Sequence, residues 1–140
     1  MRYTKENKEN GVEVRTYKDG TKEWRLGGRL HRADGPAIER ADGKRAWYIN
    51  GRRHRTDGPA IERVDGTKEW YNDGRRHRTD GPAVVWANGV KEWRINGQLH
   101  RTDGPAVVWA DGTEKWYLNG HPVEKRVVMD ELFAARVAAM

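Results

Sequence analysis

The chain has 140 residues, with 27 Lys and Arg against 21 Asp and Glu, a net charge of +6, and no cysteine. Charged residues make up 34% and hydrophobic residues 36%, and no apolar run approaches the ~20 residues of a transmembrane helix. The composition excludes disulfides, thiolate metal sites, cysteine nucleophiles and a helical membrane span. The basic charge permits attraction to acidic partners but does not identify one.

The first eleven residues are mostly charged or amide-bearing and contain no apolar stretch. We therefore expect no secretory signal and predict a cytoplasmic location. A β-array would expose an open edge here, so we assign residues 1–11 as an N-terminal tail or cap.

A 23-residue repeat occupies residues 12–122. Its full copies open with His-Arg-x-Asp-Gly-Pro-Ala, and tryptophan recurs at the same spacing without any insertion. Such a period indicates a repeat architecture in which each unit stacks on its neighbours. The predicted units are a half unit 12–30 and the full units 31–53, 54–76, 77–99 and 100–122, whose histidines are His31, His54, His77 and His100.

Each unit contains two glycine turns, as in Asp42-Gly43 and Asn50-Gly51. These dipeptides are typical of two-residue type I′ hairpin turns. Two turns in so short a unit leave no room for helices. We therefore predict an all-β repeat array of about ten short antiparallel strands, forming an elongated, twisted or curled sheet.

Two-residue turns fix the predicted register. Residue 38 would face Trp47, and Trp47 would face His54. Ile38, Trp47, Ile49 and His54 would then share the drier face of the sheet. The large indole rings on that face would supply much of the stability.

Residues 123–140 are predicted to form a C-terminal helix, because Pro122 precedes a run of good helix formers without glycine. Val128 and Leu132 lie on one side of this helix and Phe133 on another. Such a helix either caps the sheet only, or also contacts a partner or a second copy of the chain. Both interpretations stay open, including a homodimer formed through the helix.

The repeat resembles MORN-type repeats, in the variant form found in bacteria and phages. The residues that carry the resemblance are Glu69-Trp70, Asp73-Gly74, Arg75-Arg76 and His77. The chain departs from that pattern by an extra residue between Trp and the turn, and by Arg-x-Asp-Gly-Pro-Ala after the histidine. This version is similar to repeats in uncharacterised tailed-phage proteins. The resemblance implies a β-hairpin scaffold that acts as a binding module, such as a phage-encoded protein that blocks a host defence protein in the host cytoplasm.

The repeated His-Arg-x-Asp motif is a poor candidate for chemistry. A catalytic residue should be unique, the chain has no serine, and one His and one Asp per unit do not complete a metal shell. We predict no catalytic residue, no metal, no cofactor and no enzymatic activity. His54 should pack beside Trp47, Asp57 should bond backbone of its own turn, and Arg55 should pair with acids. Gly58, before a proline, suggests a bulge or bend.

Two further sets of residues are candidates for binding. Arginines at equivalent positions would form a basic stripe that is either self-paired with neighbouring acids, bound to nucleic acid, or bound to an acidic protein. Trp86 and Trp109 fill a slot that holds Tyr17, Arg40 and Arg63 in earlier units. They form either a local core under the helix or an exposed patch for a protein or a sugar.

The sequence therefore predicts a non-enzymatic protein-binding module. Nucleic-acid binding through the arginine stripe is the alternative, and carbohydrate binding is a third option. The predicted partner-binding residues are Arg52, Arg53, Arg75, Arg76, Trp86, Trp109, Val128, Leu132 and Phe133.

Overall fold

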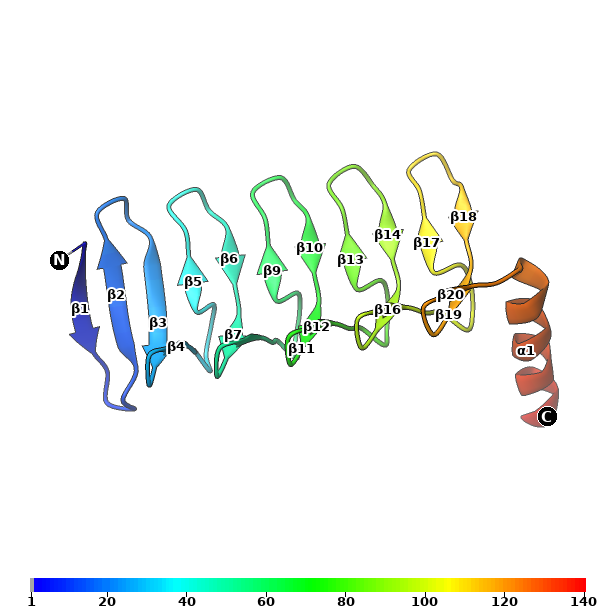
Figure 1. The fold of residues 1–140 in the computed structure, drawn as a ribbon, viewed down its shortest axis with the longest axis horizontal. Helices are drawn as coiled ribbons and strands as arrows, with labels where there is room; N and C mark the ends of the chain where they lie inside the picture. Colours follow the sequence, from blue (N-terminus) through cyan, green and yellow to red (C-terminus); the bar gives the residue numbers. More distant parts are fainter. Residues whose placement is uncertain (1) are drawn as a thin grey trace. The chain divides into compact units, whose positions relative to one another are not determined.

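The computed structural model describes residues 2–140, in two compact units, Met1–Arg75 and Arg76–Met140. Each unit consists of short antiparallel hairpins, and the second ends in helix α1, Lys125–Ala138 (Figure 1). The predicted fold class, a β-hairpin repeat array with one C-terminal helix, is confirmed. Among the described residues, no helix is both long enough and apolar enough to cross a membrane.

The first unit contains a sheet with the strand order β1-β2-β3-β5-β6-β9-β10, in which β4 also pairs with β3. Two small hairpins, β7–β8 and β11–β12, lie off this sheet. Residues 1–11 contain β1, which pairs with β2 from Tyr3↔Tyr17 to Asn7↔Glu13. The strands are β1 Tyr3–Asn7, β2 Glu13–Tyr17, β3 Lys22–Leu26, β4 Arg29–Leu30, β5 Ile38–Glu39, β6 Arg45–Ala46, β7 Tyr48–Ile49, β8 Arg52–Arg53, β9 Ile61–Glu62, β10 Lys68–Glu69, β11 Tyr71–Asn72 and β12 Arg75–Arg76.

The second unit repeats the same arrangement, with a sheet β13-β14-β17-β18 and two small hairpins, β15–β16 and β19–β20. Helix α1 follows the last hairpin, and its only fully buried side chain is Val128. The strands are β13 Val84–Val85, β14 Lys91–Glu92, β15 Arg94–Ile95, β16 Gln98–Leu99, β17 Val107–Val108, β18 Glu114–Lys115, β19 Tyr117–Leu118 and β20 His121–Pro122.

In each full repeat, the chain passes from the main sheet to a separate small hairpin at the tryptophan. The backbone N–H of Trp47 donates to the carbonyl of Ala60 at 2.7 Å, while its carbonyl accepts from His54 N–H at 3.0 Å. Residues 45–46 therefore pair within the main sheet, and residues 48–49 pair within their own small hairpin. The prediction of about ten strands is wrong, because the strand after the Asp-Gly turn of each full repeat is divided at its tryptophan and the labels run to β20, although β3 continues through Trp24.

The Asn-Gly turn has the predicted geometry. Asn50 and Gly51 both have positive φ, 49° and 81°, as a type I′ turn requires. Tyr48 pairs with Arg53 across it, and the register predicted around this turn is confirmed.

The Asp42-Gly43 turn does not adopt the predicted type I′ geometry, and the register predicted around it is wrong by one residue. Of the two turn residues only Gly43 has positive φ, at 100°, and Arg40 N–H donates to the Lys44 carbonyl across a three-residue loop. The Asp42 carboxylate accepts from Lys44 N–H at 3.0 Å and stabilises this loop. Ile38 consequently faces Ala46 rather than the tryptophan.

This shift changes which side chains form the core. In the first unit the buried cluster is Ala46, Ala60, Ile61 and Tyr71, with Trp47 packed against it but only partly buried. The driest positions hold small and branched side chains, and the repeat tryptophans lie at their margin. The alanines of Asp-Gly-Pro-Ala are all fully buried, at Ala37, Ala60, Ala83 and Ala106.

Candidate binding surfaces

The repeat histidines fasten the hairpin turns. His54 Nδ1 accepts a hydrogen bond from the backbone N–H of Asp73 at 3.1 Å, nineteen residues further along the chain. A backbone N–H can only donate, so Nδ1 of the imidazole acts as the acceptor in this bond. Its role is structural. The equivalent pairs are His31 with Asn50, His77 with Asn96 and His100 with Asn119.

The arginine after each histidine covers a tryptophan. The guanidinium of Arg55 lies 3.9 Å from the centre of the Trp47 ring, donates from Nε to Asp57 at 2.8 Å and from Nη1 to the Pro59 carbonyl at 3.0 Å. The expected pairing of Arg55 with acids is confirmed. Asp57 mainly bonds Arg55 rather than backbone of its own turn, and this hydrogen bond holds the pKa of Asp57 below its usual value. The same stack joins Arg32 to Trp24 and Arg101 to Trp93.

The glycine of Asp-Gly-Pro is needed for this stack. A Cβ on Gly58 would lie 2.9 Å from Cζ of Arg55, too close for a real contact. The backbone at Gly58 does not have positive φ, so the requirement is space for the guanidinium. From the sequence, this glycine was expected to mark a bend. Its contact with Arg55 could not be predicted, because the two residues meet only in the folded loop. The equivalent distances are 2.9 Å at Gly35, 2.8 Å at Gly81 and 2.6 Å at Gly104.

Grooves open over the tryptophan rings, and we call them the tryptophan grooves. In the first unit, one of about 820 Å³ lies over Trp24 and one of about 520 Å³ over Trp47. In the second unit, one of about 420 Å³ lies over Trp93. The latter two lie between successive His-Arg-x-Asp-Gly turns, whose exposed Thr56 and Thr102 contribute to the lining.

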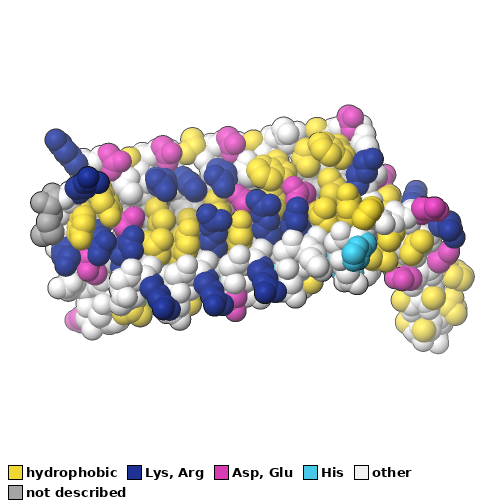
Figure 2. All heavy atoms as spheres, in the orientation of Figure 1, with side chains coloured by type: hydrophobic (Ala, Val, Ile, Leu, Met, Phe, Trp, Pro, Cys, Tyr) yellow, Lys and Arg dark blue, Asp and Glu magenta, His cyan; other side chains and the backbone are white. Residues whose placement is uncertain are grey.

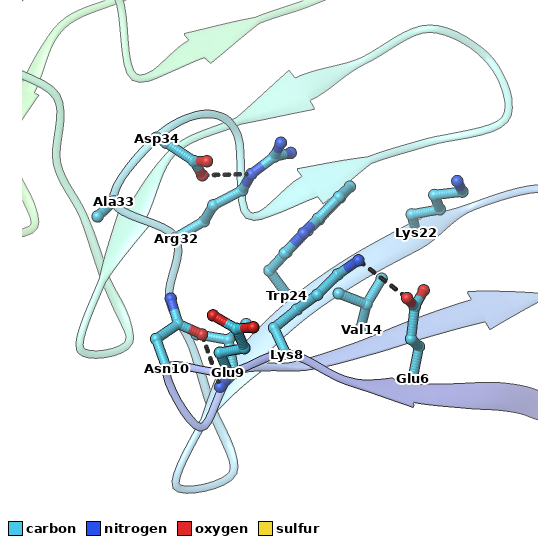
Figure 3. A pocket seen from close by; sticks show the side chains of 11 residues that line it. Glu6, Lys8, Glu9, Asn10, Val14, Lys22, Trp24, Arg32, Ala33 and Asp34 are labelled. Carbon is cyan, nitrogen blue, oxygen red and sulfur yellow. Dashed lines mark hydrogen bonds and ion pairs between the residues drawn. The ribbon is translucent and has the colours of Figure 1, made fainter.

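The first groove has a different wall, formed by the turn between β1 and β2. Figure 3 shows the ring of Trp24 at its centre, with the Arg32–Asp34 ion pair on one side and Lys8 on the other. Lys8 pairs with Glu6 at 3.0 Å. Each groove therefore combines an aromatic surface with charges of both signs.

The predicted arginine stripe is divided between two faces, because adjacent strand residues point in opposite directions. Arg52 and Arg75 are exposed, whereas Arg53 is half-buried and donates to the hydroxyls of Tyr48 at 3.2 Å and Tyr71 at 3.4 Å. The structure thus keeps Arg52 and Arg75 together with Arg29, which is also exposed, at equivalent hairpin positions. In the second unit the half-buried Arg76 lies 5.7 Å from the Trp86 ring.

The remaining predicted residues differ widely in exposure. Trp86 is half-buried and donates from Nε1 to Glu92 at 2.6 Å, whereas Trp109 is 48% exposed. On α1, Leu132 is half-buried and Phe133 is 69% exposed. Val128 is completely buried, so its side chain is not accessible to a partner.

Within residues 2–140, no group of three or more His, Asp or Glu side chains is placed to hold a metal ion. Comparison with protein-family models and with curated proteins finds no match to the chain. The resemblance to MORN-type repeats therefore stays a prediction from the sequence.

Proposed function

We propose that the protein is a non-enzymatic protein-binding module that engages its partner through the tryptophan grooves. The observation that carries the proposal is the recurrence of one surface: an indole ring, an arginine stacked on it and an aspartate that pairs with the arginine. Trp and Arg are among the residues that most often dominate the energy of protein interfaces. The stacked and paired arginine is fixed before binding, which reduces the entropy lost on association.

The charge of the grooves favours a protein over a polyanion. Arg32, Arg55 and Arg101 each pair with the aspartate two residues on, so these groups contribute little net positive charge. A protein surface offers the mixture of apolar groups, donors and acceptors that such a groove matches. The likeness of the repeats to those of tailed-phage proteins extends the proposal to a host defence protein as partner, bound and blocked in the host cytoplasm.

Nucleic-acid binding is the second candidate, and one observation favours it. Arg29, Arg52 and Arg75 are exposed at equivalent hairpin positions, and no described residue forms an ion pair with any of them. Such a row could follow a phosphate backbone, and its binding would weaken steeply with salt. A carbohydrate at the exposed Trp109 is the third candidate, and its binding would be insensitive to salt.

The test is affinity capture from bacterial lysate, with and without nuclease, using groove variants. Thr56→Glu combined with Thr102→Glu places carboxylates in two grooves at exposed positions. Val64→Glu is the matched control, because Val64 is 64% exposed and lies outside the grooves.

We expect one stoichiometric protein that survives nuclease, is lost with the groove variant and is retained with the control. Capture that is unchanged by the groove variant would refute binding through the grooves. Recovery of nucleic acid that depends on Arg52 and Arg75 would replace the proposal with the second candidate.

A further inference from the structure

A glutamate recurs on one face of the repeat sheet and is missing from two units, 31–53 and 100–122. Where it is present, it accepts a hydrogen bond from the residue six positions earlier. Tyr17 donates to Glu23 at 2.9 Å, Arg63 to Glu69 at 2.8 Å, and in the second unit Trp86 to Glu92 at 2.6 Å. In the unit 31–53 the donor is Arg40 and the position of the glutamate holds Ala46; the last unit has Lys115.

The unit 31–53 also carries a lysine at a position that is uncharged in the other units. The residue after the Asp-Gly or Asn-Gly turn is Thr21, Thr67, Val90 or Thr113 elsewhere, but here it is Lys44. Arg40 N–H donates to the Lys44 carbonyl at 2.9 Å, so the two residues are cross-strand neighbours. Their Cβ atoms are then about 5 Å apart, a distance at which like charges repel. The unit has lost a carboxylate and gained an ammonium group at one place.

A third and a fourth cation lie beside this pair. Ala46 faces Ile61 across β6 and β9, which places Lys44 next to Arg63 one step beyond the ladder. Burial and the charges of Arg63, Arg40 and Arg53 lower the pKa of Lys44, and Glu69 acts in the opposite sense. Figure 2 shows Lys and Arg side chains side by side over the β5, β6 and β9 hairpins.

Acids of the first unit offset part of this charge, because Glu69 pairs with Arg63 and Arg40 lines one hollow together with Asp19 and Glu23. Glu69 is fully buried and pairs with Arg63 at 2.8 Å, and within residues 2–140 no ion pair involves Arg40 or Lys44. Ala46, only 3% exposed, provides a small apolar floor at the place where the neighbouring repeats hold a carboxylate.

We propose that Arg40, Lys44 and Arg63 form a binding site, above Ala46, for one carboxylate group from outside the chain. The position matches the one that the neighbouring repeats fill with their own glutamate, so the surroundings already fit a carboxylate. Two guanidinium groups and an ammonium group can donate several charge-assisted hydrogen bonds to its oxygens. The source is either a free small carboxylate or an acidic side chain of a protein. This site is independent of the tryptophan grooves.

The first experiment is a titration of the ¹⁵N-labelled protein with sodium acetate, compared with sodium chloride at equal ionic strength. We expect saturable shifts of the amide signals of residues 40–46 with acetate only, with a Kd on the order of 10 mM for so small a ligand. Ala46→Glu supplies the missing carboxylate internally. It should raise Tm and abolish the acetate response, since Glu69 already fits the same slot in the next unit. Val137→Glu, at a residue of α1 that is 49% exposed, adds the same charge outside the site and should keep the response.

Equal responses to acetate and chloride in the unaltered protein would overturn the proposal, as would an acetate response that survives in Ala46→Glu. If Ala46→Glu does not fold, Lys44→Thr gives the test, because threonine is the residue in neighbouring units. That variant should weaken acetate binding about tenfold, and unchanged binding would overturn the proposal.

A short peptide with a single glutamate then identifies the source of the carboxylate. Binding tighter than that of acetate assigns the site to an acidic protein segment. Binding equal to that of acetate assigns it to a free carboxylate. Both results support the site itself, and neither depends on whether the tryptophan grooves bind a protein.

Discussion

Gly58→Ala should destabilise the protein by displacing the side chain of Arg55. The new Cβ would lie 2.9 Å from Cζ and 3.2 Å from Nε and Nη1 of Arg55. The guanidinium is the mobile partner, so it must leave the face of Trp47. The backbone at residue 58 remains accessible to alanine, because its φ is not positive.

The magnitude follows from the contacts that Arg55 loses. The stack on Trp47, at 3.9 Å, is worth about 1 kcal/mol at a partly exposed site. The hydrogen bond to the Pro59 carbonyl is worth about 1 kcal/mol. The pair with the exposed Asp57 adds little. Replacing glycine by alanine restores about 0.5 kcal/mol through the entropy of the unfolded chain, so the expected net loss is about 1.5 kcal/mol.

Urea unfolding followed by tryptophan fluorescence measures this loss, and a double-mutant cycle tests its cause. In an Arg55→Ala background there is no guanidinium to displace, so Gly58→Ala should become neutral or stabilise by about 0.5 kcal/mol. If Gly58→Ala costs the same free energy of unfolding in both backgrounds, the close approach to Arg55 is not the reason for the glycine.

Three other variants test separate parts of the structure. His54→Ala should lower the free energy of unfolding by about 1–2 kcal/mol, because the backbone N–H of Asp73 loses its acceptor. In the same urea assay, the control His121→Ala, at an exposed histidine of β20, should change the free energy of unfolding by less than about 0.5 kcal/mol. Arg55 holds the pKa of Asp57 below its usual value, so the ionised carboxylate stabilises the fold above about pH 4, and this stability is lost as the pH falls through the lower folded pKa. Between about pH 5 and pH 2, Asp57→Asn should therefore show a smaller decrease in Tm than the unaltered protein. An equal decrease in the two proteins would contradict this. Val128→Ala should cost about 2 kcal/mol and reduce the helical circular dichroism, whereas alanine at the exposed phenylalanine of the same helix should leave both unchanged.

The repeat length, the hairpins and the terminal helix could be predicted because they depend on local sequence. Asn50-Gly51 adopts the turn that its dipeptide favours. Asp42-Gly43 does not, although Asp73-Gly74 does have positive φ at both residues. The dipeptide is thus compatible with two turn types, and packing decides between them. The longer loop at Asp42-Gly43 brings Ala46 opposite Ile38 in the buried row.

The interpretation of the tryptophans was wrong for a related reason. A large apolar ring was assigned to the driest face, but in the folded chain the ring of Trp47 is covered by Arg55 of the following repeat rather than by a second layer of structure. Contacts such as His54 with Asp73 span nineteen residues, and their geometry is not visible in the sequence. The period showed that these positions matter in every unit without revealing what each one contacts.

The repeat supplies its own internal controls. Five positions recur in every full unit: the histidine, arginine, aspartate, glycine and alanine. Each has a structural role in the described residues, and together they build the tryptophan grooves. Selectivity must then come from positions that vary between units, because identical grooves alone would give identical binding. Thr56 and Ala33 differ at the groove rim, and Lys44 with Ala46 departs from its neighbours in charge. Substitutions at these varying positions should alter which ligand is bound while leaving the hairpin array intact, and substitutions at the recurring positions should act first on stability.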